Sequence, residues 1–378
     1  MSGHLIRDFA DIDRSDRPVA GGKGASLGEL TRAGVQVPPG FVVTTTAFEL
    51  ALAAIDPAGD IRARIAGLRG DDHATVARVT ADIRDRVASA PLPEDVRASV
   101  VERYRALGGH APDDDGPGDD GPGEDALAED APVEDALVAV RSSATAEDAA
   151  DASFAGLQDT YLCVRGADEV IDRVRACWAS LYNDHSVSYR LRRGYPETGL
   201  AMGVVVQRMV DPRCAGVMFT RSPTTGDRSV VVVEACWGLG SALVGGDVTP
   251  DSYVVNKVTG EIIKRTVSAK RHLHRHGPDG TGVVTEDVSE QWRDAPCLDD
   301  DELRALARLA RRVESHYGEP QDIEWAIARD LPPGENIVVL QSRPETVWAG
   351  RAAAPIAAPK ARAFDHVLDS LSHRGAAD

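Results

Sequence analysis

The clearest hydrophobic pattern lies near the C-terminus, where two short segments alternate apolar and polar residues. Residues 321–327 read Gln-Asp-Ile-Glu-Trp-Ala-Ile, and residues 337–344 read Ile-Val-Val-Leu-Gln-Ser-Arg-Pro. A Leu-Pro-Pro-Gly segment at 331–334 separates them. Alternation of period two, rich in β-branched residues and interrupted by Pro and Gly, predicts an antiparallel β-hairpin.

The same alternation assigns polar side chains to faces of this hairpin. Asp322 and Glu324 share one face of the first strand, and Val339, Gln341 and Arg343 share one face of the second. If these faces coincide, a carboxylate, an amide oxygen and a guanidinium converge. Hard oxygen ligands suit Mg²⁺, and the donor fork of a guanidinium suits a phosphate chain. The alternative is a strand pair that carries only a surface ion pair.

The remaining patterns predict helices and strands along most of the chain. The first forty residues read as a strand, a Gly-rich loop, a helix that ends near Gly34, and a second strand. Beyond Trp348, the Ala- and Pro-rich residues read as a tail. Helices are predicted at about 46–107, 168–193 and 300–316, and strands at 136–141, 203–210, 216–220 and 230–234.

The net charge narrows the classes of partner. The 378 residues carry a net charge of -18, which argues against a nucleic-acid partner. Residues 111–136 contain eleven Asp and Glu and no Lys or Arg, and without them the net charge would be -7. High charge together with Pro, Gly and few apolar residues predicts a disordered insertion over 111–135.

The cysteines and the apolar runs indicate the compartment. The five cysteines are odd in number, widely spaced and free of any C-x-x-C motif. That usage predicts reduced core thiols rather than a disulfide framework or a zinc site. The chain has no run of about 18 apolar residues, and its N-terminus lacks a signal-peptide pattern. We therefore expect a cytoplasmic protein with no membrane partner.

Two segments in the first half of the chain carry candidate phosphate-binding groups. The Gly-Gly-Lys-Gly segment at 21–24 lacks Walker A spacing, but it offers backbone N–H groups, a following helix N-terminus and one lysine. Arg141 ends a predicted strand, precedes two serines, and is followed by small and hydroxyl-bearing residues at 153–160. Each segment also has a structural interpretation, as a Gly-rich turn with a solvated lysine or a Ser/Thr-rich turn beside a structural arginine.

Two further segments admit both a functional and a structural interpretation. Residues 206–210, Val-Gln-Arg-Met-Val, have the pattern of a hinge strand between two lobes. Adenine is often held by backbone groups on such a strand, although simple core packing explains the pattern as well. His272, His274 and His276 alternate among basic residues. They fit a metal cluster, but the surrounding positive charge favours an exposed basic patch.

Taken together and in order, these segments resemble the N-terminal ATP-binding domain of the phosphoenolpyruvate synthase family, which includes pyruvate phosphate dikinase and the rifampin phosphotransferases. The similarity covers about residues 5–348. The matching segments are 21–30, 38–41, 141–148, 153–162, 207–210, 216–223, 234–240, 250–251 and both hairpin strands. The resemblance implies an α+β, ATP-grasp-like fold with two lobes that close on a nucleotide. We expect the N-terminal lobe at 1–200, the C-terminal lobe with the hairpin at 201–348, and a flexible tail at 349–378.

The resemblance also assigns roles to residues of this chain in an ATP site with Mg²⁺. Residues that would hold or contact phosphates are Lys23, Arg141 and Arg343, with Gly156 and Thr160 lining the phosphate channel. Residues that would border adenine are Gln207, Met209 and Val210, and those that would bind Mg²⁺ are Glu324 and Gln341.

Full-length members of that family continue into a domain with a phosphorylated histidine, and this chain ends before it. We therefore expect the ATP-binding subunit of a split phosphotransferase. It would transfer a phosphoryl group from ATP, giving AMP and phosphate, to a histidine on a separate partner protein that serves a small-molecule acceptor. The alternatives are a direct small-molecule kinase or ATP-grasp ligase without a phosphohistidine, and a non-catalytic ATP-sensing module. The sequence does not name the acceptor.

Overall fold

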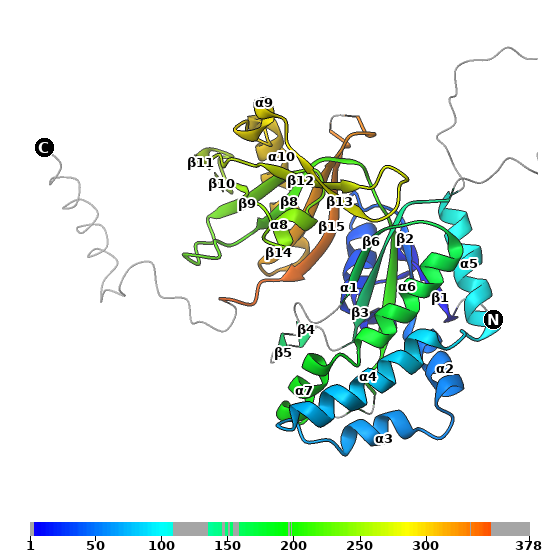
Figure 1. Ribbon diagram of the computed structural model, residues 1–378. Helices are drawn as coiled ribbons and strands as arrows, with labels where there is room; N and C mark the ends of the chain where they lie inside the picture. Colours follow the sequence, from blue (N-terminus) through cyan, green and yellow to red (C-terminus); the bar gives the residue numbers. More distant parts are fainter. Residues whose placement is uncertain are drawn as a thin grey trace, which may run out of the picture. The chain divides into compact units, whose positions relative to one another are not determined.

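Strands that are far apart in the sequence build the first of two main sheets (Figure 1). Its five antiparallel strands lie in the order β1-β2-β7-β3-β6. Their bounds are β1 Ile6–Asp8, β2 Gly40–Val43, β7 Met202–Arg208, β3 Val138–Ala144 and β6 Thr160–Val164. All seven residues of β3 are buried, as expected for a strand that is paired on both edges and covered on both faces.

In the computed structural model, the described residues up to Glu345 form one compact unit. The structure describes residues 4–108, 135–145, 148–149, 152–153, 159–195, 197, 199–332 and 334–348. The predicted acidic insertion at 111–135 lies outside these residues apart from Asp135, and so does the predicted tail at 349–378.

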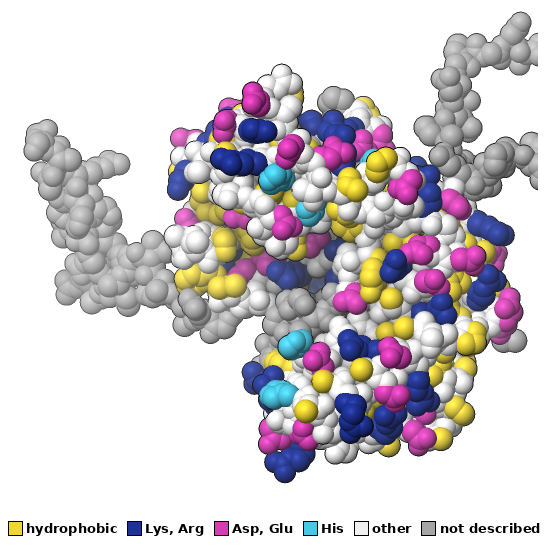
Figure 2. All heavy atoms as spheres, viewed as in Figure 1, with side chains coloured by type: hydrophobic (Ala, Val, Ile, Leu, Met, Phe, Trp, Pro, Cys, Tyr) yellow, Lys and Arg dark blue, Asp and Glu magenta, His cyan; other side chains and the backbone are white. Residues whose placement is uncertain are grey.

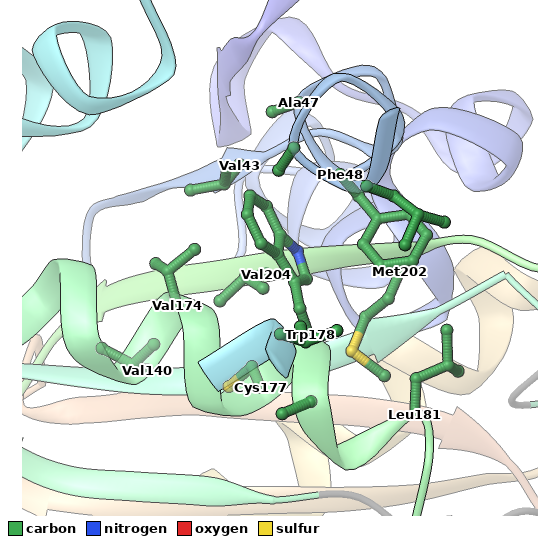
Figure 3. Packing of buried hydrophobic residues seen from close by; sticks show 14 of the residues in the cluster. Val43, Ala47, Phe48, Val140, Val174, Cys177, Trp178, Leu181, Met202 and Val204 are labelled. Atoms are coloured by element: carbon green, nitrogen blue, oxygen red, sulfur yellow. The ribbon is translucent and has the colours of Figure 1, made fainter. Parts of the chain in front are cut away.

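Helices cover the first sheet around a core centred on Trp178. The Trp178 indole is buried and meets the ring of Phe48 edge-on, with 5.8 Å between ring centroids. Val43, Met202 and Val204 surround this pair (Figure 3). The helices that follow β2 are α2 Thr45–Ile55, α3 Asp60–Ala66, α4 His73–Ser89 and α5 Glu94–Gly108, and those that follow β6 are α6 Ala167–Ser180 and α7 Asp184–Arg193.

Both long helical stretches that the sequence predicted are divided into shorter helices. The stretch at 46–107 contains breaks at Gly59, where φ is 74°, and at the Pro-containing segment 90–93. Glycine reaches positive φ without the Cβ clash, and proline cannot continue a helix interior. The predicted helix at 168–193 is interrupted at Leu181 to Asn183, so that α7 can turn back against α4.

The second sheet has six strands in the order β11-β10-β9-β8-β14-β15. Their bounds are β11 Ile262–Thr266, β10 Asp251–Asn256, β9 Val230–Trp237, β8 Pro212–Phe219, β14 Gln321–Ala328 and β15 Ile337–Pro344. The predicted hairpin at 321–327 and 337–344 is confirmed as β14 and β15. Because β7 belongs to the first sheet, the chain passes from the first sheet to the second after Arg208.

Helix α10, Asp300–Tyr317, covers one face of the second sheet. It begins at a capping box in which the Asp299 carboxylate accepts from the Glu302 N–H and the Glu302 carboxylate accepts from the Asp299 N–H. Leu306 and Val313 lie on its buried face, and Gly318 ends it with a φ of 75°. This arrangement confirms the predicted helix at 300–316.

Several smaller elements complete the described chain. β12 pairs with β13 in an antiparallel arm, and β4 pairs with β5. The bounds of these strands are β12 His272–His276, β13 Val283–Asp287, β4 Asp148–Ala149 and β5 Ala152–Ser153. The remaining helices are α1 Arg17–Arg32, α8 Ser241–Val244 and α9 Glu290–Arg293, and the 3₁₀ turns are η2 Phe9–Asp11 and η3 Arg14–Asp16. The two main sheets with their covering helices confirm the predicted α+β class.

The β14–β15 hairpin contains a bulge that sets the direction of its side chains. Glu324 pairs with Gln341, but Trp325 pairs with Val339, so Leu340 is an extra residue on β15. Directly paired residues share a face, so the prediction that Glu324 and Gln341 share one is confirmed. The prediction for Val339 is wrong, because the bulge turns it into the core beside Trp325.

One carboxylate of this hairpin is buried at a cost to stability. The side chain of Asp322 is only 17% exposed, and its Oδ2 lies 3.4 Å from Nε of the half-exposed Arg343. Burial raises the pKa of Asp322 from 3.8 to about 6, because desolvation outweighs the attraction of Arg343. The Oδ1 atom has no hydrogen-bond partner among the described residues.

A buried ion pair holds the outer part of the second sheet. The side chains of Asp251 and Lys270 are fully buried, with 2.5 Å between Oδ1 and Nζ. Asp251 also accepts hydrogen bonds from the Ser268 N–H at 2.9 Å, the Cys297 N–H at 2.8 Å and the Tyr253 hydroxyl at 3.1 Å. A buried charge with this many partners is tolerated, whereas the same charge left alone is costly.

We predict that Asp251→Asn lowers the free energy of unfolding by about 3–5 kcal/mol, because it leaves the Lys270 ammonium buried and unpaired. Urea denaturation followed by circular dichroism measures the loss. The double variant Asp251→Asn/Lys270→Met should recover part of it, since no net charge then remains buried. As the control, Asp71→Asn removes an ion pair whose side chains are 82% and 70% exposed, and it should leave the midpoint unchanged. Equal losses in the two single variants would contradict the prediction.

A second prediction concerns the pH dependence caused by Asp322. The folded chain holds this proton up to about pH 6, whereas the unfolded chain releases it near its ordinary pKa of 3.8. Folding is therefore penalised increasingly as the pH rises between these values. Asp322→Asn removes the penalty, so the variant should be more stable than the parent by about 1–3 kcal/mol at pH 7.5. The gain should vanish below about pH 4.

Thermal unfolding of both proteins between pH 4 and 8 tests this expectation. The control is Asp301→Asn, because the Asp301 side chain is 96% exposed and should give no pH-dependent gain. A gain of equal size at pH 4 and pH 7.5 would show that the carboxylate charge of Asp322 is not its source.

Candidate functional site

Arg141 connects the two main sheets at the centre of the candidate site. It extends from β3 of the first sheet and is 7% exposed. Its NH1 donates to the carbonyl of Leu340 at 2.9 Å, and its NH2 donates to Oε2 of Glu324 at 3.0 Å and to Oε1 of Gln341. Its Nε is buried without a hydrogen-bond partner among the described residues. The predicted phosphate-binding and metal-binding side chains are therefore in direct contact.

The bulge of the hairpin explains why these acceptors coincide. Glu324 and Gln341 are paired across β14 and β15, so their oxygens point to the same side of the sheet. The extra residue Leu340 turns its carbonyl towards the same guanidinium. The bulge thus supplies a third acceptor that a regular strand would use in its ladder.

A pocket of about 290 Å³ lies beside this cluster. Six of the predicted site residues line it: Arg141, Thr160, Gln207, Met209, Val210 and Glu324. The space-filling view shows basic and acidic side chains gathered in the hollow between the parts of the molecule that carry the two sheets (Figure 2). The sequence therefore identified residues from both sheets that the fold brings to one pocket.

Hydrogen bonds to neighbouring segments hold the predicted hinge strand, residues 206–210, in place. The Met209 N–H donates to the carbonyl of Leu137 at 2.8 Å, and the Met209 sulfur accepts from the Cys163 N–H at 3.0 Å. The Gln207 amide is 2% exposed and donates to the carbonyl of Pro38 at 3.4 Å. These bonds hold the apolar wall of the pocket in place and leave Met209 and Val210 to line it.

Lys23 lies on α1, outside the residues that line the pocket. The Gly-rich segment is part of α1 rather than a loop before it, with a kink at Gly21 where φ is 71°. A Cβ at Gly21 would lie 1.9 Å from the carbonyl oxygen of Ser143, so only glycine permits this contact. One turn beyond Lys23, the Ser26 hydroxyl donates to the carbonyl of Ser342 at 2.7 Å, which places this face of α1 against β15.

The remaining predicted residues are placed as follows. Gln341 contacts Arg141 directly, and Arg343 pairs with Asp322 two positions further along the hairpin. Gly156 lies outside the described residues. Thr160 begins β6 opposite Arg141. Lys23, on α1, and Arg343, on β15, are not among the residues that line the pocket.

Sequence reasoning assigned no role to Glu234, although the fold places it on the same face of the sheet as Glu324. Glu324 pairs with Val217 on β8, and Val217 pairs with Glu234 on β9, so the backbones of the two glutamates lie about 10 Å apart. Burial raises the pKa of Glu234. The signal for Glu234 in the sequence was a single carboxylate directly after the run Val-Val-Val-Val at 230–233.

The three alternating histidines do not form a metal site. His272 lies 2.9 Å from a carboxylate oxygen of Asp287, and His276 lies 3.5 Å from one of Asp211. Among the described residues, no group of three or more His, Cys, Asp and Glu side chains could hold a metal ion. All five cysteines are buried and free, as predicted. No helix in the described part of the chain is long and apolar enough to cross a membrane.

The chain matches known proteins along most of its length. Residues 17–363 match the family described as pyruvate phosphate dikinase, AMP/ATP-binding domain. The chain is 41% identical over 338 residues to a probable phosphoenolpyruvate synthase of Methanothermobacter thermautotrophicus, which covers 89% of this chain and 45% of that protein. It is 43% identical over 347 residues to a rifampicin phosphotransferase of a Streptomyces species, which covers 92% of this chain and 36% of that protein.

These matches confirm the resemblance drawn from the separate segments and the expected ATP-grasp-like fold. The chain spans less than half the length of these two relatives. The aligned part includes the hairpin, the hinge strand and Arg141, which together form the pocket described above. The chain belongs to the family of pyruvate phosphate dikinase AMP/ATP-binding domains.

Proposed function

We propose that this protein binds Mg²⁺-ATP in the pocket between its two sheets and serves as the ATP-binding part of a dikinase-type phosphotransferase. It would transfer a phosphoryl group to a histidine on a separate partner protein. The observation that carries the proposal is the convergence of Arg141, Glu324 and Gln341 at one edge of the pocket. A cation-binding pair of oxygens next to a guanidinium is what a magnesium-bound phosphate chain requires.

The character of the pocket changes along β14, and this change orients the nucleotide. Glu324 pairs with Val217, and two positions further Ala326 pairs with Ala215. The pocket is charged near Glu324 and Arg141, and apolar near Ala326, Ala215 and the hinge residue Met209. A base therefore fits against the hinge, while phosphates fit towards Arg141.

The donor set supports a magnesium site. Glu324 offers a carboxylate and Gln341 an amide oxygen, and both already converge on one positive group. Mg²⁺ prefers such oxygen ligands and takes its others from phosphate and water. When bound, the ion would neutralise the charge of the phosphate oxygens. Arg141 would hold the phosphate chain in line, so the chain's own contribution is positioning and charge compensation.

The route of the phosphoryl group follows from the family pathway. ATP would give one phosphoryl group to the partner's histidine and another to water or phosphate, which leaves AMP. The relatives that this chain matches are named phosphoenolpyruvate synthase and rifampicin phosphotransferase, and each is more than twice as long as the matched part. A direct kinase or an ATP-grasp ligase is the alternative, and it would release ADP instead.

We predict that Glu324→Ala and Gln341→Ala each weaken the binding of a non-hydrolysable ATP analogue in the presence of Mg²⁺ by about tenfold or more. The physical reason is the loss of an oxygen ligand. Isothermal titration calorimetry measures the dissociation constants, and circular dichroism checks that each variant is folded. Asp301→Ala, on the exposed side of α10, should bind like the parent. Undiminished binding by a folded double variant of Glu324 and Gln341 would remove the metal assignment.

We further predict that the purified chain consumes ATP slowly on its own. Adding a separate protein that contains the family's histidine domain, together with its acceptor, should release AMP and phosphate, measured by anion-exchange chromatography. The control is the same histidine-domain protein with its histidine replaced by alanine. Formation of ADP would favour the direct kinase or ligase. Rapid AMP formation by this chain alone with a small molecule would contradict the need for a partner.

A further inference from the structure

A serine, a histidine and an aspartate form a chain of contacts at the apolar end of the pocket. Ser241 begins α8 and lines the pocket. Its hydroxyl oxygen lies 3.0 Å from Nδ1 of His274, which β12 contributes. Nε2 of the same ring lies 3.6 Å from a carboxylate oxygen of Asp247. The side chain of His274 is 14% exposed, and that of Asp247 is 59% exposed.

The backbone holds this contact rigidly. The Leu239 N–H donates to the carbonyl of His274 at 2.9 Å, and Gly238 forms a bridge with His274. Gly238 has a φ of 69°, and a Cβ there would lie 2.3 Å from the His274 carbonyl oxygen, so glycine is required. The segment that precedes Ser241 is therefore tied to β12 by main-chain bonds as well as by the side-chain contact.

Ser241 lies at the end of the pocket where the base or the ribose of a nucleotide fits. The segment Gly238 to Ser241 follows directly on β9, whose last residue Trp237 pairs with Cys214 at the hinge end of β8. Leu239 and Val244, on either side of Ser241, also line the pocket. The charged end near Glu324 lies further along the sheet.

The Asp247 carboxylate faces Nε2 of His274, and the Ser241 hydroxyl faces Nδ1. In the tautomer that carries its proton on Nε2, towards the carboxylate, Nδ1 is an acceptor. In that tautomer the Ser241 hydroxyl donates its only proton to Nδ1. Its oxygen lone pairs remain available to the pocket, so Ser241 presents an acceptor and not a donor.

We propose that Ser241 is a specificity-determining hydrogen-bond acceptor for a donor on the nucleoside part of the nucleotide, and that His274 is the positioning residue that keeps it an acceptor. The donor is either the 6-amino group of the purine or a ribose hydroxyl, which share this chemistry. The inference rests on the proposed function, because it presumes that a nucleotide occupies the pocket. A site that accepts from a ligand donor discriminates against the analogue that lacks the donor.

Binding of three nucleotides to five proteins tests this inference. The probes are ATP, inosine triphosphate, which has an oxygen in place of the 6-amino group, and 2′-deoxy-ATP, all with Mg²⁺ and measured by isothermal titration calorimetry. The proteins are the parent, Ser241→Ala, His274→Ala, His274→Asn and the control His272→Ala. His272 alternates with His274 on β12, but it contacts Asp287 rather than Ser241.

The parent should prefer ATP to one of the two analogues. In Ser241→Ala and in His274→Ala that preference should fall about five- to tenfold, the loss expected for one hydrogen bond. If the preference for ATP over inosine triphosphate falls, the contact is assigned to the 6-amino group. If the preference for ATP over 2′-deoxy-ATP falls, the contact is assigned to the ribose. His274→Asn, whose amide oxygen can replace Nδ1 as acceptor, should restore part of the preference. His272→Ala should bind like the parent.

Two results would overturn the inference while the proposed function stands. One is tight ATP binding by Ser241→Ala with the parent's preferences unchanged. The other is an equal loss for all three nucleotides in a variant whose thermal midpoint matches that of the parent. A change in Ser241→Ala but none in His274→Ala would overturn the role of the histidine. Failure of the parent to bind any of the nucleotides would overturn the proposed function and the inference together.

Discussion

The Arg141 guanidinium, nearly removed from water, is the feature on which the site depends. A charge at 7% exposure needs acceptors, and the three acceptors described above come from the other sheet: the side chains of Glu324 and Gln341 and the carbonyl of Leu340. Because an unpaired buried charge is costly, the position of one arginine couples the arrangement of the two sheets. The same groups are those that a phosphate chain and its metal would engage.

Other contacts join α1 and the segment after it to β15 and α10 of the second sheet. The Val339 N–H donates to the carbonyl of Gln36, and the Ser26 hydroxyl donates to the carbonyl of Ser342. His316 of α10 lies 2.6 Å from the carboxylate of Glu29 on α1. α1 therefore spans from the first sheet to the hairpin, and any relative movement of the sheets has to break or slide these contacts together with those of Arg141.

Buried charges serve different ends in different parts of the molecule. Asp251 and Lys270 satisfy one another away from the pocket, so their burial is compatible with stability. Asp322 is buried beside Arg343 with one oxygen unpartnered, and its raised pKa shows that the folded chain disfavours its charge. Such unsatisfied groups concentrate where binding needs them. The hairpin thus gives up some stability at the place where the proposed phosphate contacts lie.

The sequence by itself determined the α+β class, the β14–β15 hairpin and the capped helix α10, because period-two alternation, capping residues and Gly or Pro breaks are local signals. The family resemblance of its segments also named six of the residues that line the pocket: Arg141, Thr160, Gln207, Met209, Val210 and Glu324. The sequence could not place Val339, because a bulge adds Leu340 to β15 and reverses the faces beyond it, and the alternation within either strand alone does not show where a bulge lies. Only the tertiary structure decided three further relations. They are the place of β7 in the first sheet, the alignment of Glu324 with Glu234 across β8, and the contact of Ser241 with His274. Each of these relations joins segments far apart in the chain, and strand order and register are set by packing rather than by local pattern.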